Sequence, residues 1–328
     1  MRQYKVLMVA ELGNEWNSGW WKKAGFEKNG HIVVPFNPRT EIEPRDRLIE
    51  IIKETKPDFL LHFKDELPPS VFEDLRKYVK VVQWYPDPLI PDWLPAYVRA
   101  ADIFVTMTEG LSGEFRKLNP DSFWLTEAFE PSYFEIKNIT ERDIKEFSTE
   151  VTFVGNLGSK PQYLPRRDFL KAVVKNGFSL KWWGPKIPRK LSTLHLISGK
   201  LGRAYGGRFV WGEDHAKIAK LSKIYLGFDS MPQMRQSMSE RLYIAVGCGA
   251  FYMCQHVDGI EDILVPDKEI VTFKSEQEMI DKIKYYLKHE DIRLKIAEAG
   301  NRRVLKEHTF EVRIRELLNI IEDAWSDL

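Results

Sequence analysis

Short apolar segments alternate with helix-forming segments along almost the whole of this 328-residue chain. The apolar segments are rich in β-branched and aromatic residues and lack a polar face, which is typical of strands buried on both sides in a parallel sheet. Between them, apolar residues recur at helical spacing, as Leu48, Ile51 and Ile52 do in RDRLIEIIKET (45–55). This alternation predicts an α/β protein whose parallel sheets are covered by helices on both faces.

The alternation forms two series, separated by a charged stretch without apolar periodicity at 141–150. The expected strands are 4–10, 31–36, 58–63, 80–85 and 102–107 in the first series, and 150–155, 179–184, 208–211, 223–228, 250–254 and 269–273 in the second. We therefore expect two doubly wound, Rossmann-like domains, one over 1–145 and one over 150–309, with a final helix (310–328) completing the first. Two such domains in sequence imply a cleft between them, and such sheets bind ligands at the carboxyl ends of their strands.

The composition disfavours several classes of protein. With 49 basic and 48 acidic residues, the net charge of +1 gives no reason to expect general attraction to nucleic acid or acidic membranes. Cys248 and Cys254 offer no disulfide framework and are interpreted as buried small hydrophobes of a reducing compartment. The first apolar run is too short for a signal peptide, and no stretch approaches the roughly 20 residues that a bilayer requires. A cytoplasmic protein without a transmembrane segment is expected.

The stretch ERLYIAVGCGAF (240–251) has the features of an anion-binding helix. A helix over 239–247 would present free backbone N–H groups, the positive end of its dipole, Ser239 and the Arg241 guanidinium on its first turn. Arginine matches phosphate oxygens bidentately, so this combination suits a diphosphate. Gly249 would allow close backbone approach, although a glycine at the end of a helix is more often a C-cap.

A second turn follows in HVDGIEDILVP (256–266). Asp258 and Gly259 end a strand, and a short helix is expected to begin at Ile260. Glu261 would either accept hydrogen bonds from ligand hydroxyls or complement the dipole of that helix.

These segments carry a family resemblance. ERLYIAVGCG, VDGIEDIL, KEIVTF and AEAGNRRVLKEHT, all within 240–309, resemble the C-terminal half of CgeB-type glycosyltransferases, which are GT-B enzymes allied to the group 1 (GT4-like) nucleotide-sugar transferases. VTFVGNLG (151–158) resembles the start of that domain, and KVLMVAELGNEWNSGWW (5–21) and VVQWYPDP (81–88) resemble the N-terminal half more loosely. The resemblance implies a GT-B fold and a nucleotide sugar, UDP- or GDP-linked, as co-substrate with no other cofactor. It also implies transfer to a hydroxyl of a glycan, protein or other acceptor.

The resemblance also implies a set of donor-binding residues in the second domain. They are Gly155, Asn156, Arg166, Gly184, Gln236, Ser239, Glu240, Arg241, Gly249, Asp258, Gly259 and Glu261. The chain departs from the group 1 pattern at Ile244, where a glutamate usually precedes Ala-x-x-x-Gly. The companion position eight residues earlier, which is usually acidic, is occupied by Gln236. Glu240 lies one helical turn before Ile244 and is a partial substitute. The departure leaves open a catalytically silent nucleotide- or sugar-binding protein with the same fold.

The chemistry of sugar transfer makes its own demands. The leaving diphosphate must be stabilised by a metal or by fixed cations and helix dipoles. The sequence contains no Asp-x-Asp, so Arg166, Arg241 and helix N-termini are expected to act without a metal. An NAD-dependent oxidoreductase or epimerase is disfavoured, because VAELGNEW (9–16) holds one glycine where the dinucleotide fingerprint has three.

Candidate catalytic and acceptor-binding residues lie in the first domain. Asp87, in WYPDP at the end of a strand, is the best placed general base, although Pro-Asp-Pro is also a common rigid turn. His62 also ends a strand, and a structural role is the alternative. Group 1 relatives are mostly retaining, and there the leaving phosphate can accept the proton while Asp87 orients the acceptor. The loop ELGNEWNSGWW (11–21) is the expected acceptor site, through Gly13, Asn14, Trp16, Asn17 and Trp20, with core packing as the alternative for Trp20.

Overall fold

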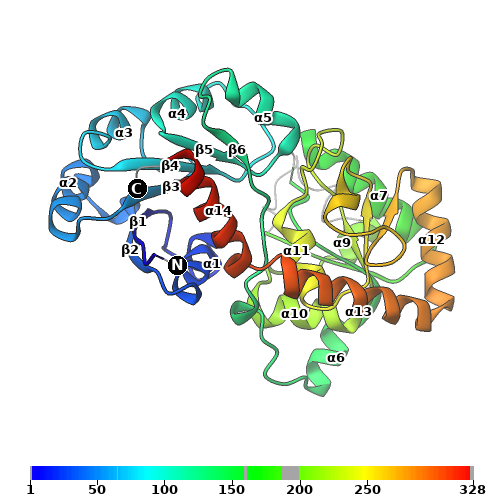
Figure 1. The fold of residues 1–328 in the computed structure, drawn as a ribbon. Helices are drawn as coiled ribbons and strands as arrows, with labels where there is room; N and C mark the ends of the chain where they lie inside the picture. The colour runs from blue at the N-terminus through cyan, green and yellow to red at the C-terminus, as the bar shows by residue number, and fades with distance from the viewer. Residues whose placement is uncertain (1, 65, 159–160, 186–198, 326–328) are drawn as a thin grey trace. The chain divides into compact units, whose positions relative to one another are not determined.

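The structure is a computed structural model that describes residues 2–64, 66–158, 161–185 and 199–325. The chain forms two compact units (Figure 1). Unit 1 comprises Met1–Glu130, Met234–Ser237 and His308–Leu328, and unit 2 comprises Pro131–Gln233 and Met238–Glu307. Each unit is built around its own parallel sheet, as the alternation of segments predicts.

Unit 1 contains a six-stranded sheet in the order β2-β1-β3-β4-β5-β6, in which neighbouring strands are parallel. The strands are β1 Lys5–Val9, β2 Ile32–Phe36, β3 Phe59–Phe63, β4 Lys80–Tyr85, β5 Ile103–Thr106 and β6 Ser122–Trp124. The helices are α1 Ser18–Lys28, α2 Pro44–Thr55, α3 Pro69–Leu75, α4 Leu94–Ala100, α5 Glu109–Arg116 and α14 Phe310–Ala324. Five of these strands are predicted from the sequence, and β6 is too short to show a pattern.

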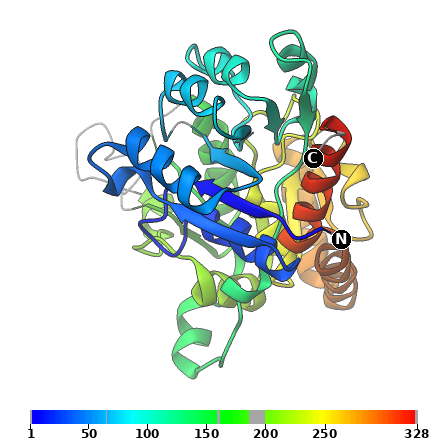
Figure 2. The same cartoon turned by 60° about the vertical axis from the view of Figure 1, so that its left-hand side comes forward.

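Helices cover both faces of the unit 1 sheet. Helices α2 to α5 form a common core with one face, where Leu48, Phe72 and Phe104 are buried together. Helices α1 and α14 pack on each other, and a Cβ at Gly25 of α1 would lie 2.7 Å from the Phe310 carbonyl oxygen. Both ends of the chain lie in this unit (Figure 2). The Tyr4 hydroxyl donates to Glu322 Oε1 at 2.8 Å. The predicted final helix, 310–328, is α14, and residues 326–328 lie outside the described residues.

Unit 2 contains a five-stranded parallel sheet in the order β11-β10-β9-β7-β8. The strands are β7 Thr149–Val154, β8 Leu180–Trp183, β9 Ser222–Gly227, β10 Tyr252–Gln255 and β11 Val271–Phe273. The helices are α6 Glu141–Phe147, α7 Leu164–Lys175, α9 Gly199–Arg203, α10 Gly212–Leu221, α11 Glu240–Gly247, α12 Glu276–Lys288 and α13 Glu290–Glu307. The order of the strands places β7 and β9 side by side in the centre, so their carboxyl ends lie together.

The predicted strand at 208–211 is wrong. These residues form no strand of the described sheet, although the Arg208 carbonyl oxygen accepts from the Gly184 N–H at 3.3 Å. The chain approaches the outer edge of β8 through a single bridge between Trp182 and Tyr205 and then turns away at Gly207, where φ is +85°. A short apolar run was therefore insufficient to identify a strand here.

The charged stretch at 141–150 belongs to unit 2. Thr140 and Asp143 form a capping box that begins α6, and Lys217 of α10 donates to Asp143 at 3.1 Å. The chain therefore passes from unit 1 to unit 2 earlier, after Glu130.

The two cysteines are free thiols. Cys254 is fully buried and Cys248 is partly buried, and burial raises the pKa of both thiols. Within the described ranges, no helix is long and apolar enough to cross a membrane.

A pH dependence of stability follows from the core of unit 1. His62 on β3 is 0% exposed, and burial lowers the pKa of its imidazole from 6.5 to about 4. Below pH 6.5 the imidazole is protonated in the unfolded chain, whereas in the folded chain it stays neutral down to about pH 4. The free energy of unfolding therefore decreases as the pH is lowered from 6.5 to about 4. We expect His62 to cost about 2 kcal/mol of unfolding free energy at pH 5 relative to pH 7.5.

Urea denaturation of wild type and H62Q at the two pH values measures this contribution. The decrease on going to pH 5 should be about 2 kcal/mol smaller in H62Q. L61A, which removes a neighbouring core side chain without a titratable group, should lower the stability by a similar amount at both pH values. An equal pH dependence in wild type and H62Q would show that His62 is not the group responsible.

Candidate functional site

The Arg241 guanidinium lies at the carboxyl edge of the unit 2 sheet, on the first turn of α11. Its Nε donates to the carbonyl oxygen of Val154, the last residue of β7, at 2.6 Å, and its Nη1 donates to that of Phe228, which follows β9, at 2.9 Å. Nη1 also lies 3.3 Å from Ser239 Oγ. These bonds leave Nη2 without a hydrogen-bond partner among the described residues. The side chain therefore joins two strand ends and keeps N–H groups available for a ligand.

Gly155 makes room for this guanidinium. A Cβ at residue 155 would lie 2.9 Å from Arg241 Nη2 and 2.7 Å from the Phe153 ring, closer than such contacts normally come. The neighbouring strand β8 ends in the same way, because a Cβ at Gly184 would lie 2.3 Å from the Gly155 carbonyl oxygen. Two of the predicted glycines thus allow close packing at this edge of the sheet.

Arg166 brings a second guanidinium to the same region. It lies on the first turn of α7 and is 4% exposed, its Nη2 donates to Ser230 Oγ at 2.9 Å, and its guanidinium lies over the Tyr163 ring. Burial, and next the charge of Arg241, lower the pKa of Arg166 to about 10. Arg166 is therefore charged at neutral pH although the Arg241 guanidinium lies near it, which is an arrangement that an anion between or beside the two side chains would stabilise.

Asp229 was missed by the sequence analysis. It follows β9, is 4% exposed, and its Oδ1 accepts from the Ser239 N–H at 2.8 Å, where α11 begins. Its Oδ2 is buried without a hydrogen-bond partner in the described part of the chain. The carboxylate favours the charged form of Arg166 and so partly offsets the repulsion between the two arginines. In the sequence, the position of Asp229 directly after the predicted buried strand 223–228 could have identified it as a candidate site residue.

A buried histidine of α10 lies close enough to Arg241 to be affected by its charge. His215 Nε2 lies 2.8 Å from the Tyr225 hydroxyl, and burial, with a smaller contribution from Arg241, lowers the pKa of His215 to about 3. His215 is thus neutral in the folded protein and adds no charge to the site.

The other predicted donor-binding residues near this edge lie on the turns after β7 and β10 and at the start of α11. Asn156 is exposed after β7, and its Oδ1 accepts from the Gly158 N–H at 2.7 Å, which forms a local turn. Gly259, with φ of +78°, begins a short 3₁₀ helix, Ile260–Asp262, beyond the carboxyl end of β10. Asp258 and Glu261 on this turn are exposed. Glu240 is the first residue of α11, one turn from Ile244, which is 7% exposed.

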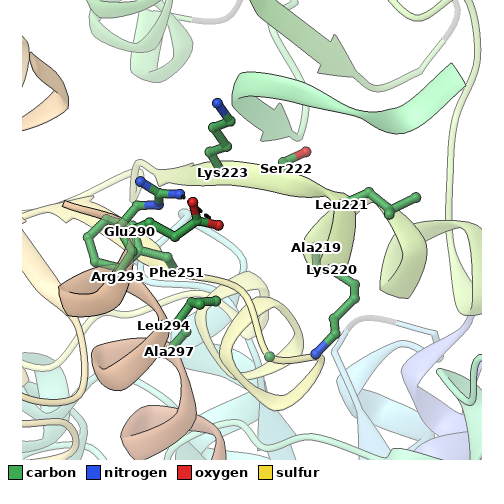
Figure 3. A pocket seen from close by; sticks show the side chains of 11 residues that line it. Ala219, Lys220, Leu221, Ser222, Lys223, Phe251, Glu290, Arg293, Leu294 and Ala297 are labelled. Atoms are coloured by element: carbon green, nitrogen blue, oxygen red, sulfur yellow. Dashed lines mark ion pairs between the residues drawn. The ribbon is translucent and has the colours of Figure 1, made fainter. Parts of the chain in front are cut away.

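Two predicted donor-binding residues do not belong to this group. The Gly249 N–H donates to Val246 O and the Ala250 N–H to Ala245 O, which is a Schellman cap at the far end of α11, about 12 Å from its start. Gly249 instead borders a pocket of about 290 Å³ at the amino edge of the sheet, where Lys220, Lys223 and Arg293 also lie (Figure 3). Gln236 is 3% exposed and belongs to unit 1.

In unit 1, Asp87 follows β4 and is paired with Lys64, with Nζ and Oδ2 2.8 Å apart. His62 is enclosed in the core, where its Nδ1 bonds to Gln83 and its ring stacks on Tyr97. Because it has no exposed surface, His62 lies out of reach of an acceptor hydroxyl, and its prediction as a catalytic base is wrong.

The predicted acceptor residues precede or begin α1. Gly13, Asn14 and Trp16 are exposed, and Trp16 is 43% exposed. Asn17 lines a small pocket of unit 1. Trp20 is half-buried, with the Lys23 ammonium 6.0 Å from the centre of its ring. Among the described residues, no group of three or more His, Cys, Asp or Glu side chains is placed to hold a metal ion.

The hydrogen bonds of Arg241 predict a structural cost for its removal. R241A leaves the Val154 and Phe228 carbonyl groups without their charged donor, so we expect the unfolding free energy to fall by about 1.5–3 kcal/mol. R142A is the control, because the Arg142 side chain on α6 is 89% exposed and its removal should change stability by less than about 0.5 kcal/mol. Chemical denaturation measures both, and equal effects would contradict the bridging role of Arg241.

Comparison with protein families gives a partial match. Residues 166–319 match the model of a family described as glycosyl transferase-like. No curated protein sequence matches the chain significantly. The CgeB-type subfamily therefore stays a prediction.

Several solved structures resemble the whole chain. A glycosyltransferase from Rickettsia africae has a TM-score of 0.71 at 13% identity, with 100% of both chains covered. HepE of Anabaena in complex with UDP-glucose has a TM-score of 0.68 at 10% identity, covering 98% of this chain and 100% of that chain. The catalytic domain of starch synthase IV from Arabidopsis thaliana, bound to ADP and acarbose, has a TM-score of 0.72 at 9% identity, with 99% of both chains covered. With two parallel-sheet Rossmann-like units, the chain has the GT-B fold of such glycosyltransferases.

Proposed function

We propose that this protein is a glycosyltransferase that moves a sugar from a nucleoside-diphosphate sugar to an acceptor hydroxyl without a metal ion and with retention of configuration. In this reaction the bond between the anomeric carbon and the diphosphate breaks, a bond to the acceptor oxygen forms, and the acceptor proton passes to the leaving diphosphate. Unit 2 binds the donor and unit 1 binds the acceptor.

The observation that carries the proposal is the pair of neighbouring guanidiniums at the carboxyl edge of the unit 2 sheet. Arg166 and Arg241 both lie on the first turn of a helix, so the positive ends of two helix dipoles add to their charges. Negative charge develops on the diphosphate as the sugar leaves, and fixed cations that need no rearrangement stabilise it at that moment. The two arginines would thus do the work for which other transferases use a metal.

In unit 1, Asp87 is the residue proposed to orient the acceptor. Its carboxylate is held by Lys64 at the carboxyl edge of the sheet and is about 40% exposed, so it can accept a hydrogen bond from a hydroxyl. In a retaining reaction the diphosphate accepts the proton, and Asp87 needs only to fix the direction of the acceptor oxygen.

UDP is the first nucleotide to test, because HepE of Anabaena is known in complex with UDP-glucose. ADP is the second, because the starch synthase IV domain is bound to ADP, and GDP is included from the sequence expectation. Isothermal titration in the presence of EDTA should give binding of one of these nucleoside diphosphates without added metal. A requirement for Mg²⁺ or Mn²⁺ would remove the metal-free part of the proposal.

Variants assign the binding to the site. R241A should weaken the binding of the nucleoside diphosphate by about 10- to 150-fold, as expected for the loss of a charged hydrogen bond worth 1.5–3 kcal/mol. R166Q, which keeps a polar side chain opposite Ser230, should weaken it similarly and serves where R241A unfolds. R142A, on the exposed face of α6, should bind as wild type does.

The same experiment addresses a second candidate, a nucleotide-binding protein without catalytic activity. Ile244 favours it, because α11 presents an almost buried aliphatic side chain where a glutamate is expected. Tight nucleotide binding without hydrolysis or transfer of any donor sugar would support that candidate. No binding of any nucleoside diphosphate would overturn both.

A further inference from the structure

The pocket at the amino edge of the unit 2 sheet is separate from the proposed donor site. It has a volume of about 290 Å³ and lies where α10 leads into β9, where α11 leads into β10 and where α13 begins (Figure 3). All of its lining residues belong to unit 2. Gly249, which borders this pocket, follows the end of α11, whereas Arg241 lies on the first turn of that helix. A ligand here would therefore occupy a site apart from the diphosphate.

Arg293 of α13 brings a buried guanidinium to this pocket. The residue is 4% exposed, and its Nη1 donates to the Tyr286 carbonyl oxygen. Its Nη2 lies 3.9 Å from Glu290 Oε1, which is too far for a hydrogen bond, and Nε donates to no described residue. Neither Nε nor Nη2 is among the fully enclosed polar atoms that lack a partner, so both keep accessible surface in the lining. The guanidinium therefore has unpaired N–H groups that a ligand can reach.

Two lysines add positive charge at the rim of the pocket. Lys220 on α10 and Lys223 on β9 are exposed, and neither ammonium has an ion pair or a hydrogen bond with a described residue. Figure 3 shows the two side chains extending to different sides. Exposed lysines have flexible stems that can turn toward a bound anion, whereas a buried arginine is already fixed.

The charges of the lining are not balanced. Glu290 is its one acidic residue, beside three basic residues, so the lining carries a net charge of +2. The Glu290 side chain is 74% exposed, so water screens its charge from the cations. The negative end of a helix dipole accounts for Lys220 in the last turn of α10, but not for Lys223 on a strand or for the burial of Arg293.

The remainder of the lining is mainly apolar. Leu221, Phe251, Leu294 and Ala297 contribute to it, and Leu294 is 62% exposed. The body of a ligand would remove this apolar surface from water. A cavity of about 150 Å³ holds a benzene ring, so this pocket has room for one ring and a charged group attached to it.

We propose that this pocket binds a small organic phosphomonoester, with its phosphoryl group at the three cations and its body on the apolar part of the lining. A phosphomonoester carries a charge of about −1.5 to −2 at pH 7, which matches the lining. Its oxygens also accept hydrogen bonds from a guanidinium in pairs. The inference goes beyond the proposed function, since it requires neither the donor nor the acceptor.

The test is isothermal titration of the full chain with phenyl phosphate in the presence of EDTA. Phenyl phosphate should bind with a dissociation constant of about 0.1–3 mM, as is usual for a small polar ligand. Inorganic phosphate lacks the apolar body and should bind at least about threefold more weakly. Benzoate keeps the ring but carries a single charge, and it should bind at least about fivefold more weakly.

Variants of the rim place the ligand in the pocket. K220A/K223A should weaken the binding of phenyl phosphate about five- to thirtyfold, as for the loss of two exposed charge contacts. K268A/K295A is the charge-matched control, because Lys268 and Lys295 are exposed lysines of unit 2 outside the lining. E290Q removes the acidic residue of the lining and should tighten the binding about two- to fivefold.

Two further variants assign the contacts. R293K keeps the positive charge but loses the planar fork of donors, so it should weaken the binding of phenyl phosphate about three- to tenfold. R166Q removes one guanidinium of the proposed donor site and should bind phenyl phosphate as wild type does. Conversely, K220A/K223A should bind nucleoside diphosphates as wild type does.

Phosphomonoesters occur both as soluble metabolites and as the headgroup of phosphatidate, and sedimentation with phosphatidylcholine vesicles that contain phosphatidate distinguishes the two sources. Vesicle binding that K220A/K223A loses and K268A/K295A keeps would identify a lipid as the source. Binding of phenyl phosphate without such vesicle binding would identify a soluble molecule.

Three results would overturn the inference: phenyl phosphate does not bind, benzoate or inorganic phosphate binds as tightly, or K220A/K223A binds as K268A/K295A does. Loss of phenyl phosphate binding in R166Q with retention in K220A/K223A would also overturn it, because it would place the phosphoryl group at the donor site. Nucleoside diphosphate binding that depends on Arg166 and Arg241 would leave the proposed function standing in each of these cases.

Discussion

The hydrogen bonds between Arg241 and the ends of β7 and β9 determine what the carboxyl edge of unit 2 can do. A guanidinium that donates to two strand-end carbonyl groups is fixed before any ligand arrives, so no side-chain entropy is lost when an anion binds to its remaining N–H groups. The same bonds require a glycine at 155, since a Cβ there would occupy the space of Nη2. Structure and binding therefore depend on one side chain, and its replacement affects both.

Arg166 and Arg241 show how two like charges are kept close together in a folded protein. Burial, and next the charge of Arg241, lower the pKa of Arg166, so the second guanidinium adds to the cost of burying the first. Asp229 offsets part of this repulsion while it also holds the Ser239 N–H where α11 begins. The remaining positive charge is not matched by a described side chain of the unit, which suits the binding of a diphosphate.

The sequence predicts the layers of the fold well because buried parallel strands and the helices between them have distinct periods. It fails where tertiary contacts decide. Residues 208–211 are apolar enough for a strand but form none in the described structure, and Met234–Ser237 joins unit 1 although it lies within the second series. Gly249 illustrates the same limit, because close approach to a ligand and a helix cap require the same residue type. The structure shows that Gly249 caps the C-terminal end of α11, whereas Arg241 lies at the other end of the helix.

Lys22 shows why a buried charge of unit 1 was not predicted. On the sequence, a lysine within SGWWKKAGFEK (18–28) is indistinguishable from Lys23 beside it, and both would be assigned to an exposed helix face. The approach of α14, which Gly25 permits, buries Lys22 beneath Phe310, and Glu127 reaches it from more than a hundred positions away in the chain. A cation at the same place without Glu127 would be an uncompensated buried charge, so the burial of Lys22 depends on a pairing that no local pattern encodes.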